Sequence, residues 1–136
     1  MKLATIRTAD ATRAVRIDED AAVETGHADL DELLSHTDWR ELAAAANGAR
    51  HVPQGLSYAP PVTRPEKIVC VGLNYRTHIL EMGRELPEHP TLFAKYSRSL
   101  IGAYDDIVLP AVSAAVDWEA ELGVVIGSPI RHATEG

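Results

Sequence analysis

Cysteine is nearly absent from this sequence, because Cys70 is the only one among 136 residues. A single cysteine cannot form an intrachain disulfide, so we expect a protein of a reducing compartment, the cytoplasm. No apolar run approaches the roughly 20 residues that a membrane-spanning helix needs. The N-terminus also lacks an apolar stretch followed by a small-residue cleavage site, as a signal peptide would have. These absences predict a cytoplasmic protein with no membrane partner.

An excess of basic residues is also missing. The chain has 13 lysines and arginines against 20 aspartates and glutamates, which gives a formal net charge of −7. A nucleic-acid-binding protein would favour a basic face, so we expect no nucleic-acid partner. The segment Val71–Asn74 contains one glycine and lacks the further glycines of a phosphate-binding loop. The composition is otherwise that of an ordinary soluble globular protein.

Prolines divide the chain into two parts that differ in character. Pro53, Pro60, Pro61 and Pro65 lie in a stretch with little periodicity. Proline removes a backbone donor and restricts the residue before it, so residues 53–65 are predicted to be an extended linker. This divides the chain into a small N-terminal domain over residues 1–52 and a second domain that begins at residue 66.

The N-terminal part is predicted to contain a hairpin followed by two helices. Residues 3–7 and 12–17 alternate between apolar and polar, and Thr8-Ala9-Asp10 suits the turn between them. Asp29 and Asp38 are each followed by a glutamate three residues on, a spacing that resembles a capping box. The second helix is expected to end near Asn47-Gly48.

The second part is predicted to be rich in strands. Residues 67–73 form a short β-branched apolar run, and a helical turn is expected from Asn74 to about Met82. Further strands are expected at residues 91–95, 107–110 and 116–126, with a turn at residues 102–106.

Acidic residues alternate along the last of these predicted strands. Asp117, Glu119 and Glu121 would share one face, because side chains two residues apart on a strand point the same way. Glu119 and Glu121 could then hold one hard cation through oxygen ligands, with Mg²⁺, Mn²⁺ or Ca²⁺ suitable. The alternative is a solvated face of an amphipathic strand. The apolar run Val124-Val125-Ile126 favours the metal site, since carboxylates on a strand that enters a core need a partner.

His78, Glu81 and Lys95 are the other candidate site residues. His78 and Glu81 are three residues apart on the predicted helical turn, so the carboxylate could orient the imidazole as a general base. Lys95 follows apolar neighbours and could contact a substrate carboxylate or a developing oxyanion. The alternatives are a surface pair and a surface lysine. Cys70 is interpreted as an inert packed thiol.

The ordered set of these segments resembles the fumarylacetoacetate hydrolase family. The resemblance rests on five segments: Lys67–Tyr75 with His78 and Glu81, Pro90–Lys95, Asp105–Pro110, Val116–Leu122, and Val124–Gly127. It implies a β-rich α+β fold, an incomplete mixed β-sheet roll preceded by a small N-terminal α/β domain. By the same resemblance, residues 66–136 are the start of the catalytic domain.

The resemblance also implies roles for individual residues. Glu119 and Glu121 match the family's strand-borne metal ligands, usually for Mg²⁺, with Mn²⁺ or Ca²⁺ also found. His78 matches the catalytic histidine, Glu81 its partner, and Lys95 a pocket lysine. The implied function is metal-dependent cleavage of a carbon–carbon bond in a small 2-oxo or β-diketo acid, in aromatic or amino-acid catabolism. Isomerisation of hydroxy-dienoates and decarboxylation of oxo-acids are alternatives within the family, which is usually dimeric.

The family's third metal ligand, an aspartate, would lie beyond Gly136. Two carboxylates alone are a poor Mg²⁺ site, because the ion prefers octahedral oxygen coordination. We therefore expect this polypeptide alone to be weakly active or inactive, as a truncated piece of such an enzyme. The alternative from another functional class is a non-catalytic remnant that acts in folding or dimerisation.

Overall fold

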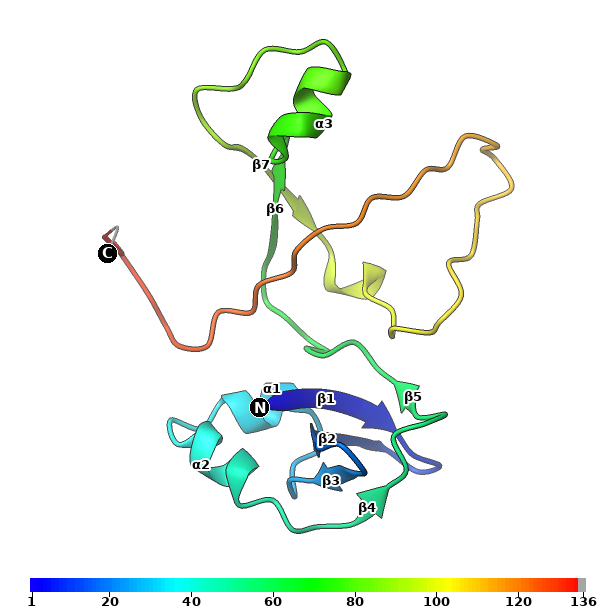
Figure 1. Ribbon diagram of the computed structural model, residues 1–136, viewed down its shortest axis with the longest axis vertical. Helices are drawn as coiled ribbons and strands as arrows, with labels where there is room; N and C mark the ends of the chain where they lie inside the picture. Colours follow the sequence, from blue (N-terminus) through cyan, green and yellow to red (C-terminus); the bar gives the residue numbers. More distant parts are fainter. Residues whose placement is uncertain (135–136) are drawn as a thin grey trace.

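The first half of the chain folds around one antiparallel sheet. The computed structural model describes residues 1–134, with a five-stranded sheet in the order β4-β3-β2-β1-β5 (Figure 1). Its strands are β1 (Lys2–Arg7), β2 (Thr12–Ile17), β3 (Ala22–Glu24), β4 (Arg50–His51) and β5 (Ser57–Tyr58). Each neighbouring pair in this order is antiparallel.

The predicted N-terminal hairpin is confirmed. All six residues of β1 pair with β2, from Lys2 opposite Ile17 to Arg7 opposite Thr12. The Thr8 amide donates to the Ala11 carbonyl at 2.8 Å, and the Thr8 hydroxyl donates to the same oxygen. This side-chain bond explains why a turn without glycine is stable here.

The alternation along β1 and β2 divides the core between the two faces of the sheet. One face carries Ala14, which packs with residues of the two helices: Leu30, Leu33 and Ala43. The other face carries Ile6 and Val15, which pack with Ala22 and with the partly buried Leu56 and Tyr58. Successive side chains on a strand point to opposite faces, so a short hairpin supplies both layers.

The two helices are α1 (Leu30–Leu34) and α2 (Trp39–Ala44). Asp29 caps α1 as predicted, and its carboxylate accepts from the Glu32 amide at 2.9 Å. Glu32 in turn accepts from the Ala28 amide at 2.6 Å. Asp38 occupies the N-cap position of α2 as predicted, but its side chain makes no capping hydrogen bond. The helix ends at Ala44, a few residues before the predicted end near Asn47-Gly48.

The proline-rich stretch of residues 53–65 is attached to the sheet and to α1. β5 lies within it and pairs with the end of β1. The buried Thr5 hydroxyl donates to the Pro61 carbonyl at 2.9 Å. Asp31 accepts from the Thr63 amide and hydroxyl, both at 2.6 Å. These bonds fix the direction in which the chain leaves the first sheet.

The second half of the chain contains a two-stranded antiparallel sheet. It consists of β6 (Ile68–Gly72) and β7 (Thr91–Lys95), and α3 (Arg76–Glu81) lies in the connection between them. A short 3-10 turn follows at Ser97–Ser99. The predicted strand at residues 67–73, the helical turn from Asn74 to about Met82 and the strand at residues 91–95 are confirmed. The ribbon is little buried, however, since every residue of β7 is exposed.

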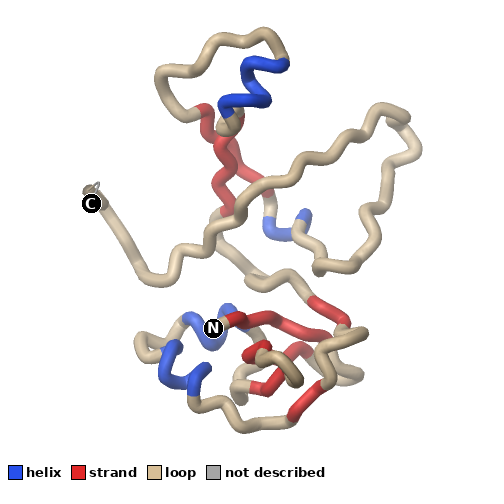
Figure 2. The backbone as a smooth tube through the Cα atoms, in the orientation of Figure 1, coloured by secondary structure: helices blue, strands red, loops and turns tan. Residues whose placement is uncertain are grey.

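Residues 103–134 form a long irregular excursion without strands or helices (Figure 2). The predicted turn at residues 102–106 is present, with the Asp105 amide donating to the Gly102 carbonyl at 3.1 Å. The strands predicted at residues 107–110 and 116–126 are wrong. A strand needs a neighbour for its backbone donors and acceptors, and none runs beside these stretches in the described part of the chain.

One polar cluster joins the first sheet to the second half of the chain. Arg7, at the end of β1, donates to both carboxylate oxygens of Asp105, at 2.9 and 2.6 Å, and to the Tyr58 carbonyl. The rings of Tyr58 and Tyr104 meet edge to face at 5.8 Å. Gly102 is buried against Tyr58, so close that a Cβ would overlap the carbonyl oxygen. We name this cluster the Arg7 junction.

The β-rich character predicted from the sequence is confirmed. The mixed-sheet roll remains a prediction, because the described strands pair only in antiparallel fashion. A separate N-terminal domain also remains a prediction. Within residues 1–134, no helix has both the length and the apolar character needed to cross a membrane.

Candidate functional site

The turn between β6 and α3 sets the position of the candidate catalytic histidine. Leu73 has φ of 54°, a left-handed conformation that is unfavourable for a residue with a Cβ. Tyr75 follows in an extended conformation as the N-cap of α3. Gly83, with φ of 67°, comes directly after the C-cap, where a left-handed residue commonly ends a helix.

His78 lies in α3 and contacts Glu119 from the irregular excursion. Its Nε2 is 3.6 Å from the Glu119 Oε1, and the two side chains are 50% and 66% exposed. This distance allows an ion pair when the imidazole is protonated, although it is slightly long for a hydrogen bond. An exposed pair of this kind contributes about 0–1 kcal/mol. The pair therefore contributes little to the stability of the fold.

A second contact joins the same two segments. The Leu122 amide donates to the Tyr75 hydroxyl at 3.1 Å, across 47 residues of sequence. Tyr75 precedes His78 by three residues, and Leu122 follows Glu119 by three. The two contacts therefore share one antiparallel register between α3 and residues 119–122.

Within residues 1–134, neither Glu81 nor Lys95 makes a hydrogen bond or ion pair with His78 or Glu119. Glu81 is the last residue of α3, and within residues 1–134 no hydrogen bond or ion pair joins it to His78. Lys95 lies opposite Ile68, at the far end of the ribbon from α3. At about 3.3 Å per residue, the four steps from Thr91 place it roughly 13 Å along the strand.

Glu119 and Glu121 are the right type of ligand for a hard cation, but two carboxylates are too few to hold one. Both offer carboxylate oxygens, the ligand type that Mg²⁺, Mn²⁺ and Ca²⁺ prefer. Among residues 1–134, however, no three acidic, histidine or cysteine side chains gather closely enough to hold a metal ion. Within residues 1–134 the donor set is therefore incomplete, and we derive no chemical step through a metal.

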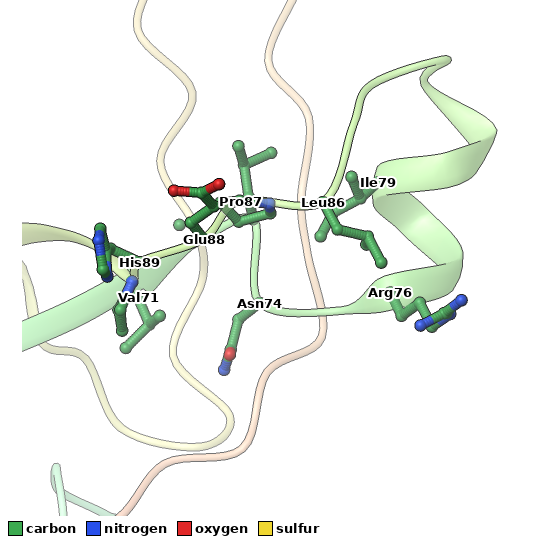
Figure 3. A pocket seen from close by; sticks show the side chains of 11 residues that line it. Val71, Asn74, Arg76, Ile79, Leu86, Pro87, Glu88 and His89 are labelled. Carbon is green, nitrogen blue, oxygen red and sulfur yellow. The ribbon is translucent and has the colours of Figure 1, made fainter.

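A shallow cavity of about 330 Å³ lies between the start of α3 and the loop that leads to β7 (Figure 3). Apolar residues such as Val71, Ile79 and Leu86 form part of its walls. The polar side chains, among them Asn74, Arg76 and His89, are spread around it in Figure 3 and do not converge. His78 is not part of its lining, so the cavity and the candidate catalytic pair are distinct features.

The contact through Tyr75 is the feature that sequence reasoning missed. Tyr75 belongs to the motif that marks the family resemblance, yet nothing in the local pattern shows that its hydroxyl accepts a bond. The partner is a backbone amide, which every residue except proline carries, so Leu122 itself gives no signal in the sequence.

Comparison with known proteins places the second half of the chain. Residues 67–136 match the family model described as fumarylacetoacetate (FAA) hydrolase, C-terminal. The oxaloacetate tautomerase Fahd2a, mitochondrial, of Rattus norvegicus is 48% identical over 77 residues, which cover 57% of this chain and 25% of that protein. An uncharacterized protein of Archaeoglobus fulgidus is 46% identical over 80 residues, covering 59% of this chain and 32% of its own length.

A solved structure extends the likeness into the first half. The crystal structure of an HpcE-like protein from Mycobacterium smegmatis superposes with a TM-score of 0.67 at 30% identity, covering 82% of this chain and 41% of the other. The chain spans about a quarter to a third of the length of the curated relatives it matches.

Proposed function

Because this chain belongs to the fumarylacetoacetate hydrolase family, we propose that it carries the acid–base part of an active site for a small 2-oxo acid. The reaction that its geometry supports best is keto–enol tautomerisation, with oxaloacetate as the first substrate to test. The observation that carries the proposal is the 3.6 Å approach of the Glu119 carboxylate to the His78 imidazole. The tautomerases among the relatives support the choice of substrate.

Tautomerisation needs only proton transfer, which an imidazole can perform. His78 Nε2 would take a proton from the carbon beside the keto group of the substrate. The carbon–carbon double bond then forms, and the carbonyl electron pair moves to the oxygen. The same imidazolium returns the proton to that oxygen, so the enol is an isomer of the substrate with no net proton gained or lost. Glu119 would stabilise the imidazolium by its charge.

A divalent cation belongs to the proposal as a second, separate element. Glu119 and Glu121 would supply two of its oxygen ligands, and further ligands must come from outside the described residues. A bound cation would supply stabilisation of the enolate charge. Glu81 and Lys95 are proposed to act beyond the pair, in orienting the site and in binding a substrate carboxylate.

Carbon–carbon bond hydrolysis of a β-diketo acid is the second candidate. The description of the matching family model, which names a hydrolase, favours it. The same imidazole would then deprotonate a water molecule instead of the substrate carbon. The two candidates differ in product, because hydrolysis of an acylpyruvate releases two acids whereas tautomerisation releases none.

The direct test compares the rate of oxaloacetate tautomerisation by the whole chain with that of two histidine variants. We expect a weak but measurable acceleration over buffer, followed by enol absorbance. His78→Gln should remove this acceleration and return the rate to that of buffer, because it removes the proposed general base. His132→Gln, at an exposed loop position, is the matched control and should leave the rate unchanged.

The alternative of a non-catalytic remnant makes the opposite prediction. Equal rates for the wild type, the His78→Gln variant and buffer would overturn the catalytic proposal for this chain. A parallel assay with an acylpyruvate, with product acids separated by chromatography, distinguishes the hydrolytic candidate.

A further inference from the structure

We propose that Tyr75 is a positioning residue, whose hydroxyl holds residues 119–122 against α3 and so keeps Glu119 beside His78. The inference deepens the proposed function and rests on it only for the catalytic consequence. The Tyr75 hydroxyl accepts one hydrogen bond from the Leu122 amide at 3.1 Å, and Leu122 lies three residues after Glu119, whose carboxylate is positioned. We call this hydrogen bond the tether.

The excursion that carries Glu119 has little else to hold it. Residues 116–126 form no strand, and within residues 1–134 no backbone–backbone hydrogen bond joins them to another segment. Large apolar side chains of this stretch are exposed, with Trp118 at 78% and Leu122 at 83%. Packing therefore does not fix Glu119, and specific contacts must do so.

The ion pair alone is a weak restraint. Both of its side chains are at least half exposed, and water screens their attraction. Ordering a flexible segment costs conformational entropy for every residue that is fixed. The Tyr75 hydrogen bond lowers the entropy cost of the ion pair, because residues 119–122 are already held near α3 when Glu119 contacts His78.

Tyr75 is suited to this task by its place in the fold. It is the N-cap of α3, in extended conformation, directly after the Leu73-Asn74 turn that leaves β6. Its backbone is thereby fixed between a paired strand and a helix. The Tyr75 carbonyl accepts from the Ile79 amide at 3.0 Å, and Ile79 is the buried residue of α3. The hydroxyl therefore projects from an anchored position.

The experiment measures the effect of the Glu119 carboxylate on the NMR shift of the His78 ring, in chains with and without the Tyr75 hydroxyl. The readout is the change in the His78 ring-proton NMR shift caused by Glu119→Gln at one fixed pH, in the wild-type and Tyr75→Phe backgrounds. The His78→Gln spectrum identifies the resonance among the six histidines. Tyr96→Phe is the matched control, because Tyr96 is 86% exposed and its hydroxyl makes no hydrogen bond within residues 1–134.

Removing one hydrogen bond of ordinary strength changes a local equilibrium about fivefold. We therefore expect the shift response to Glu119→Gln to fall severalfold in the Tyr75→Phe background and to stay unchanged in the Tyr96→Phe background. Leu122→Pro removes the donor from the other side and should reproduce the effect of Tyr75→Phe, whereas Val124→Pro should not. An undiminished response in both Tyr75→Phe and Leu122→Pro would overturn the inference.

The outcome is separable from that of the tautomerase assay. A reduced shift response in a chain without catalysis would support the tether and overturn only the proposed function. An undiminished response in a chain whose activity depends on His78 would overturn the tether and leave the proposed function intact. Trp39 fluorescence, recorded in a Trp118→Phe background, reports on the helix-side core of the first sheet and checks that each variant is folded.

Discussion

Replacing Thr5 with valine should destabilise the first sheet more than replacing it with serine. Thr5 is fully buried in β1. Its hydroxyl accepts from the Leu30 amide at 3.1 Å and donates to the Pro61 carbonyl at 2.9 Å. It therefore links the strand, the first turn of α1 and the proline-rich stretch. Valine keeps the shape of the side chain but removes both bonds.

The expected loss of unfolding free energy depends on whether the Leu30 amide and the Pro61 carbonyl find other hydrogen-bond partners in the valine variant. The Leu30 amide lies at the N-terminus of α1, where no intrahelical acceptor exists, and it is buried. Leaving such a group unsatisfied costs about 1–3 kcal/mol. Pro61 is exposed, so water can replace its lost bond at a net cost of about 1 kcal/mol. The expected loss of unfolding free energy is thus about 2–4 kcal/mol. Serine keeps both bonds and loses one buried methyl group, at about 1 kcal/mol.

Urea unfolding followed by Trp39 fluorescence measures these losses, in a Trp118→Phe background that removes the signal of the exposed tryptophan. Thr12→Val is the matched control, because the Thr12 hydroxyl makes no hydrogen bond in the described chain. A Thr5→Val variant as stable as Thr5→Ser would refute the reasoning, since the hydroxyl would then contribute nothing.

Three further predictions concern the Arg7 junction and the carboxylates. Gly102→Ala should cost about 1–3 kcal/mol by overpacking against Tyr58, whereas Gly127→Ala, with no atom within 4 Å, should cost nothing measurable in the same urea assay. Hydrogen bonds from Arg7 hold the pKa of Asp105 below its ordinary value of 3.8. The stabilisation by this carboxylate is therefore present above pH 3.8 and lost as the pH falls through the lowered pKa. The NMR shifts of the Tyr104 ring, which belongs to the same junction, should therefore change as the pH falls through this pKa. Asp105→Asn should abolish that pH dependence. Adding Mg²⁺ should move the Glu119 side-chain resonances only at about millimolar or higher concentrations, because residues 1–134 hold no group of three metal ligands; tight binding by this chain would contradict this expectation.

Elements that depend on local pattern were predictable from the sequence. The hairpin of β1 and β2 has its period of two and its own turn. Asp29 carries its cap signal three residues from Glu32. The apolar run of β6 also gave a correct strand. Each of these signals is contained within a few neighbouring residues, so tertiary structure did not override it.

Elements that depend on distant partners were not predictable. β4 and β5 are two residues long and exist only because β3 and β1 present free edges. Residues 116–126 carry a strong strand pattern, yet no neighbouring strand in the described chain completes a ladder. The same limit applies to the site. The resemblance suggested that a histidine and an acidic segment belong together, but the pairing of His78 with Glu119 rather than Glu81 required coordinates.

Residues 119–122 lie against α3, and a nuclear Overhauser measurement on the whole chain checks this arrangement without any substitution. We expect a cross-peak between the Tyr75 ring protons and the Leu122 amide proton. Cross-peaks between Cys70 and Phe93, which are opposite each other in the β6–β7 ribbon, provide the internal standard. A spectrum that contains the standard but no cross-peak between Tyr75 and Leu122 would show that residues 119–122 do not lie against α3.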